Sequence, residues 1–87
     1  MRYVNVHDIR WTKNHDTFET MPVEGNNVIT LSLENIVAIV DQKAREHRPE
    51  LICKVWMSNN TFFIVTHKTG ERLRDLLMQD TNKVIKG

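Results

Sequence analysis

The amino-acid sequence predicts an α+β protein, in which a small, mostly antiparallel β-sheet of about four strands is followed by one C-terminal helix. Two observations predict this class. Residues 51–67, LICKVWMSNNTFFIVTH, are two apolar, β-branched and aromatic runs on either side of Asn59 and Asn60, which is typical of a β-hairpin. After His67 the leucines follow a helical spacing. With 87 residues the chain is expected to form one small domain with a single core.

The hairpin is expected to have a two-residue type I′ turn at Asn59 and Asn60, because asparagine tolerates the positive φ angle that both turn positions require. Counting outward gives three pairs on the predicted core face, which are Met57 with Phe62, Val55 with Ile64 and Cys53 with Thr66. The opposite face pairs Trp56 with Phe63, Lys54 with Val65 and Ile52 with His67. This face is also mostly apolar, so a second layer, from the same chain or from another subunit, is expected to cover it.

The N-terminal half supplies the other predicted strands. Residues 3–12 have strand character, with a change of phase near Asp8 that indicates a bulge. Residues 13–27 are rich in polar and turn-forming residues, which predicts a long loop or a poorly paired arm. Most such segments are simple connections, and a site of subunit exchange or ligand contact is the alternative. Residues 28–41 form two short runs separated by a bulge or turn at Leu33-Glu34-Asn35, and the second run is apolar on both faces, which predicts a central strand covered on both sides.

The last element is expected to be a helix over residues 70–79. Thr69 is the predicted N-cap, since a threonine hydroxyl can accept a hydrogen bond from a free backbone N–H at a helix start. Leu73, Leu76 and Leu77 then form an apolar stripe at helical spacing. This stripe is expected to cover one face of the sheet.

Composition excludes several classes of protein. The twelve basic and eleven acidic residues leave a net charge of +1, which provides no strong attraction to nucleic acid or to an anionic membrane. The longest apolar run, residues 36–40, is far shorter than a membrane span, and the N-terminus lacks the apolar region of a secretory signal. A cytoplasmic location is therefore expected, and the single Cys53 is interpreted as a buried structural thiol.

The sequence contains no recognisable set of catalytic or metal-binding residues. It has no phosphate-binding, dinucleotide-binding, zinc-protease, hydrolase or CxxC motif. His7-Asp8 and His15-Asp16 resemble the His-Asp pairs of metal-dependent phosphohydrolases, but the large helical framework that completes those sites is missing. We therefore expect no enzymatic activity, no cofactor and no metal.

The candidate binding residues fall into two groups. A basic cluster after the predicted central strand contains Lys43, Arg45, His47 and Arg48, and the second face of the hairpin carries Lys54, Trp56 and Phe63. Aromatic side chains beside basic ones suit the stacking of single-stranded nucleic acid. The same residues suit a small phosphorylated ligand or signalling nucleotide at a subunit interface. The alternative to both binding functions is that the basic cluster belongs to a solvated loop and that the aromatic residues Trp56 and Phe63 are buried.

Over residues 28–78 the sequence resembles the small FlbD-like family associated with bacterial flagella. The resemblance rests on a turn reading LENIVAI, a hairpin reading ICKVWMSNNTFFIV and a helix reading TGERLRDLL. Similar strand-hairpin-helix patterns occur in LytTR-like DNA-binding domains and in small phage-encoded regulators. The resemblance implies this fold and a non-catalytic regulatory role. The Asn-Asn turn departs from the family's usual Asn-Gly, and residues 1–27 have no counterpart.

Together these features predict a non-enzymatic binding or regulatory module. We expect a homo-oligomeric accessory protein, of phage or bacterial type, that inhibits or sequesters a partner or ligand. The subunit contact is expected on the second face of the sheet.

Overall fold

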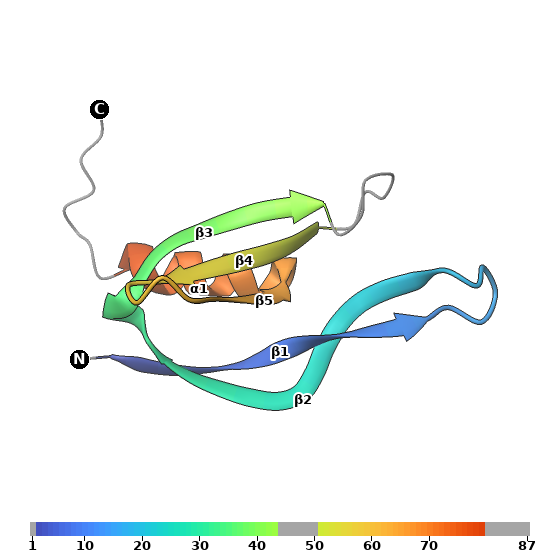
Figure 1. Ribbon diagram of the computed structural model, residues 1–87, viewed down its shortest axis with the longest axis horizontal. Helices are drawn as coiled ribbons and strands as arrows, with labels where there is room; N and C mark the ends of the chain where they lie inside the picture. Colours follow the sequence, from blue (N-terminus) through green and yellow to red (C-terminus); the bar gives the residue numbers. More distant parts are fainter. Residues whose placement is uncertain (1, 44–50, 80–87) are drawn as a thin grey trace.

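The computed structural model describes residues 2–43 and 51–79, and it confirms the α+β class. The described residues form five strands, one 3₁₀ turn and one helix (Figure 1). The strands pair in two antiparallel sheets, β1–β2 and β3–β4–β5, where a single sheet of about four strands was predicted. The elements are β1 (Tyr3–Lys13), β2 (Thr20–Ser32), η1 (Leu33–Asn35), β3 (Ile36–Lys43), β4 (Leu51–Met57), β5 (Phe62–Thr66) and α1 (His67–Gln79).

The two-stranded sheet is a long hairpin with the bulge that the sequence predicts near Asp8. The pairing between β1 and β2 shifts between His7 and Ile9, where residues 25–27 of β2 lie opposite Asp8. The Asp8 carboxylate accepts hydrogen bonds from the backbone N–H of Asn27 at 3.3 Å and from the side-chain amide of the same residue at 2.9 Å. Gly25 is needed there, since a Cβ at this position would lie 3.1 Å from Cγ of Asp8 and closer still to a carboxylate oxygen.

The prediction of a long loop over residues 13–27 is wrong, because only the turn 14–19 lies outside the strands. Thr20 already pairs with Lys13, and the pairing continues to the bulge. The far end of the hairpin extends beyond the second sheet (Figure 1). We call residues 9–24 the arm. Cross-strand backbone pairing holds this polar segment in strand form, a long-range effect that its composition does not reveal.

The break predicted at Leu33–Asn35 is a 3₁₀ turn, and it joins the two sheets. Glu34 is fixed there, since the backbone N–H of Arg2 donates to both of its carboxylate oxygens at 3.2 and 3.1 Å. These bonds lower the pKa of Glu34 to about 2. The strand that follows is not the predicted central one. In the order β3–β4–β5 it is an edge strand, and Val37 is exposed.

The β4–β5 hairpin exists, but its register differs by one residue from the prediction. The backbone N–H of Met57 donates to the carbonyl of Thr61 at 2.8 Å, so the loop has three residues, 58–60. Of these, only Asn60 has a positive φ, of 66°. Val55 therefore pairs with Phe63, and Trp56 pairs with Phe62. A shift of one residue turns every side chain of one strand to the other face, so the predicted faces are right for β4 and wrong for β5.

Helix α1 begins at His67, three residues earlier than predicted, directly after β5. The hydroxyl of Thr66, in place of the predicted Thr69, accepts a hydrogen bond from the Thr69 backbone N–H at 3.2 Å and caps the helix. Leu73 is fully buried and the stripe packs as predicted. The core draws on both sheets and the helix through Val6, Leu31, Leu33, Cys53, Val55, Val65 and Leu73.

Candidate functional site

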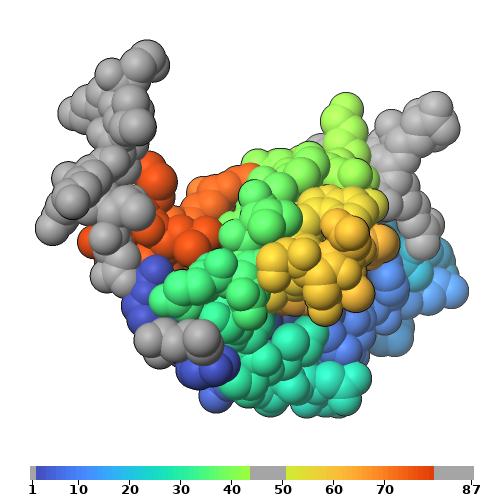
Figure 2. Space-filling view, turned by 60° about the vertical axis from the view of Figure 1, so that its left-hand side comes forward, coloured from blue at the N-terminus to red at the C-terminus, as the bar shows by residue number. Residues whose placement is uncertain are grey.

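The face of the three-stranded sheet turned away from α1 is partly exposed. Ala38, Val40 and Phe62 are exposed on it, whereas Ile52, at the start of β4, is buried. Cys53, Val55 and Val65 point into the core, so the side chains that alternate with them along the strands lie on the opposite face. In Figure 1 the helix lies behind β4 and β5, and Figure 2 shows β3 in green beside the yellow to gold β4–β5 hairpin at the surface. We call this surface the outer face and define it by Ala38, Val40, Lys54, Trp56, Phe62 and Ile64.

An aromatic pair with a lysine dominates the outer face. The ring centroids of Trp56 and Phe62 are 4.7 Å apart, with an angle of 46° between the ring planes. The Lys54 ammonium lies 4.4 Å from the Phe62 centroid and 5.6 Å from that of Trp56, within the range of cation–π attraction. Phe62 remains 46% exposed. The surface therefore offers apolar rings and one positive charge together.

The structure brings together some of the predicted site residues and separates others. Lys54 and Trp56 are neighbours on the outer face, as predicted. Phe63 is on the core side and partly buried, so the prediction that it faces Trp56 is wrong. Lys43 is exposed at the end of β3. The other three members of the basic cluster, Arg45, His47 and Arg48, lie outside the described residues.

Phe62 and Phe18 are the residues that sequence reasoning missed. Phe62 was placed on the wrong face by the register. Phe18 lies in the turn of the arm, where it is 73% exposed and has a positive φ of 59°. Its backbone N–H donates to the carbonyl of Asn14 at 2.8 Å, which holds the turn closed. A bulky aromatic residue seldom adopts this backbone conformation, and no pattern in the sequence signals it.

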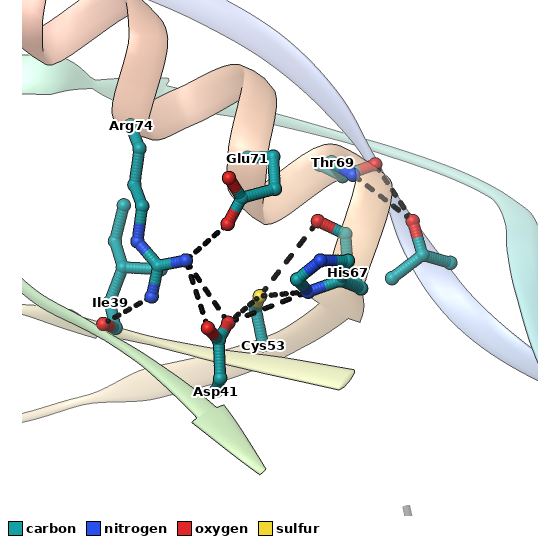
Figure 3. Close-up of polar contacts among 8 residues, drawn as sticks. Ile39, Asp41, Cys53, His67, Thr69, Glu71 and Arg74 are labelled. Carbon is teal, nitrogen blue, oxygen red and sulfur yellow. Dashed lines mark hydrogen bonds and ion pairs between the residues drawn. The ribbon is translucent and has the colours of Figure 1, made fainter. Parts of the chain in front are cut away.

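A polar cluster lies where β3, β4 and the start of α1 meet (Figure 3). The Cys53 thiol donates to Oδ1 of Asp41 at 3.0 Å, and its Sγ is 4.0 Å from Nδ1 of His67. Nη1 of Arg74 donates to both carboxylate oxygens of Asp41 at 3.1 Å and also to Glu71. Nη2 of Arg74 donates to the carbonyl of Ile39 at 3.0 Å. These bonds tie the helix to the edge strand.

The cluster does not activate the thiol for nucleophilic attack. Cys53 has no exposed surface, and burial, followed by the Asp41 carboxylate, raises the pKa of its thiol to about 12. The hydrogen bonds from Cys53 and Arg74 in turn lower the pKa of Asp41. A thiol must be deprotonated to react as a nucleophile. Its burial agrees with the structural role that the sequence predicted for it.

Comparison with protein-family models, curated proteins and solved structures found no match. Within the described residues, no helix has the length and apolar character needed to cross a membrane.

Proposed function

We propose that this protein is a non-enzymatic binding module that acts as a homo-oligomer, in which the arm of one copy packs on the outer face of another. The observation that carries the proposal is the exposed part of the outer face. Trp56 and Phe62 lie side by side on it, with Ala38 beside Trp56, and the next row consists of Val40, Lys54 and Ile64. Adjacent apolar side chains at the surface of a small protein are typical of a contact surface.

The tip of the arm has the complementary chemistry. Phe18 exposes its ring, and the Lys13 ammonium lies 5.3 Å from the ring centroid. The acidic residues Asp16 and Glu19 are close to it in the chain. The outer face as defined here carries Lys54 and no acidic residue. The two acids outnumber Lys13, so an aromatic ring on a net acidic tip matches the rings and the ammonium of the outer face. A contact of the outer face with itself would instead bring two lysines together without an acid, which disfavours that arrangement.

The backbone of Phe18 supports a role in binding. A positive φ at a non-glycine residue costs about 1 kcal/mol or more, and such strain is found preferentially at functional positions. The turn in which it occurs exposes the aromatic ring to solvent. Since each copy has one arm and one outer face, two copies related by a twofold axis would make the same contact twice.

The test is sedimentation velocity over a range of concentrations, combined with thermal unfolding of the dilute monomer. Phe18→Asn should relieve the strain, because asparagine tolerates this φ. The monomer should therefore become more stable by about 1 kcal/mol, while self-association weakens at least about tenfold through loss of the ring. A purely structural role for Phe18 predicts higher stability with unchanged association. Val28→Thr, which alters an exposed apolar residue of β2 outside the arm, is the matched control.

Charge reversal tests the pairing of the two surfaces. Lys54→Glu should weaken association, and a chain carrying both Asp16→Lys and Glu19→Lys should restore it when mixed with the Lys54→Glu chain. Lys68→Glu, at an exposed position in α1, is the control for net charge. A chain that stays monomeric at high concentration would overturn the proposal. So would quenching of Trp56 fluorescence by single-stranded oligonucleotides without self-association, which would assign the outer face to nucleic acid.

A further inference from the structure

Three different metal-ligating side chains converge in the polar cluster. They are Asp41 from β3, Cys53 from β4 and His67 from the first position of α1 (Figure 3). Their ligand atoms lie within 4.8 Å of one another. The separations are 3.0 Å between Sγ and Oδ1, 3.6 Å between Nδ1 and Oδ1, and 4.0 Å between Sγ and Nδ1.

These separations are close to those of a tetrahedral zinc site. With zinc–sulfur bonds of about 2.3 Å and zinc–nitrogen or zinc–oxygen bonds of about 2.0–2.2 Å, neighbouring ligand atoms lie about 3.3–3.7 Å apart. The separation of 3.6 Å lies within that range, and the other two, 3.0 and 4.0 Å, differ from it by only a few tenths of an ångström. Small side-chain movements, with no change in the backbone, would bring the three atoms to one ion.

The surroundings support a bound dication. Arg74 fixes Asp41 and is itself held by Glu71 and by the Ile39 carbonyl, and such partners of a ligand orient it for a metal. Asp41, Glu71 and Arg74 together carry a charge of −1, and the Cys53 thiolate would make it −2. A divalent cation would neutralise this charge. The positive charge of Arg74 repels a cation, but the carboxylate of Glu71 offsets this repulsion.

Access and selectivity follow from the same side chains. Cys53 is buried, whereas the side chains of Asp41 and His67 are 38% and 42% exposed, so the ion would enter from their side. Three protein ligands leave a fourth position for water. A thiolate with an imidazole favours zinc over magnesium or calcium. We propose that Asp41, Cys53 and His67 form a binding site for a zinc-class divalent cation, which replaces the thiol proton and releases it to solvent.

The test is titration of the chelator-treated, full-length chain with Co²⁺, followed by competition with Zn²⁺. A thiolate ligand should give sulfur-to-cobalt charge-transfer absorption together with visible bands of a four-coordinate ion, and Zn²⁺ should remove both. Zn²⁺ should also raise the thermal unfolding temperature, because a ligand that binds only the folded chain stabilises it. Asp41→Asn and His67→Gln should weaken binding by at least about tenfold.

Controls separate this site from adventitious binding. His15→Gln removes an exposed histidine in the turn of the arm and should leave the Co²⁺ spectrum unchanged. Cys53→Ala should remove the charge-transfer band. If that variant does not fold, the His67→Gln titration decides the question, since His67 is partly exposed at the start of α1. Absence of the charge-transfer band in the parent chain, or equal affinity in His67→Gln, overturns the proposal.

Discussion

Gly70 of α1 lies against Cys53 of β4, and replacing it with alanine tests how tightly the helix packs on the sheet. A Cβ at position 70 would lie 2.6 Å from the Cβ of Cys53 and closer still to its Sγ. Carbon atoms in normal contact are about 3.5–4.0 Å apart, so helix and strand must separate by about 1 Å. Leu73, which is fully buried on the same helix, would move with it.

The expected loss can be worked out from two opposing effects. Overpacking of a filled core costs about 1–3 kcal/mol, and alanine in place of glycine within a helix returns up to about 1 kcal/mol. A Cβ–Cβ distance of 2.6 Å places the overpacking cost in the upper part of this range, at about 2–3 kcal/mol. After a helical gain of about 1 kcal/mol, we expect Gly70→Ala to lower the free energy of unfolding by about 1–2 kcal/mol. For a small domain, the free energy of unfolding falls by about 1 kcal/mol per molar urea, so this loss lowers the urea midpoint by about 1–2 M.

The assay is urea unfolding followed by circular dichroism on four chains: the parent, Gly70→Ala, Cys53→Ala and the double variant. Removing Sγ leaves room for part of the new methyl group. The double variant should therefore lose about 1 kcal/mol less free energy of unfolding than the sum of the two single losses. Asp75→Ala compared with Asp75→Gly, at an exposed position of the same helix, reports the gain of alanine over glycine without a clash. A Gly70→Ala chain as stable as the parent, or two strictly additive losses, would refute the close packing.

Two further predictions concern the ends of elements. Thr66→Val removes the hydroxyl that caps α1 and should destabilise the protein by about 1 kcal/mol, which urea unfolding of the variant measures; an unchanged midpoint would contradict the cap. Hydrogen bonds from Arg2 lower the pKa of Glu34 to about 2, below its usual 4.5. Its contribution to stability is therefore present above pH 4.5 and is lost as the pH falls towards 2. The urea midpoint of Glu34→Gln should depend less on pH over this interval than that of the parent, and equal dependence would rule out the assigned role.

The sequence by itself was enough to predict the presence of β4, β5 and α1 and the bulge in β1. Alternation over residues 51–67 predicts two strands and places Cys53 and Val55 of β4 on the core side, because side chains in a strand alternate whatever its partner. The helical spacing of Leu73, Leu76 and Leu77 likewise determines which side of α1 is buried. The bulge near Asp8 is visible as a change of phase. Each of these features depends on residues that are close together in the chain.

The tertiary structure decided what depends on hydrogen-bond geometry and on pairing, which alternation along one strand does not reveal. The three-residue loop before Thr61 sets the register of β5 and puts Phe62, in place of Phe63, beside Trp56. The edge position of β3 follows from the sheet order, which the alternation of its own residues does not reveal. The polar cluster exists because pairing aligns Asp41 with Cys53 and because Thr66 starts the helix early enough to bring His67 to them. Composition and spacing describe each of these residues separately, whereas their chemistry depends on the distances that the fold creates between them.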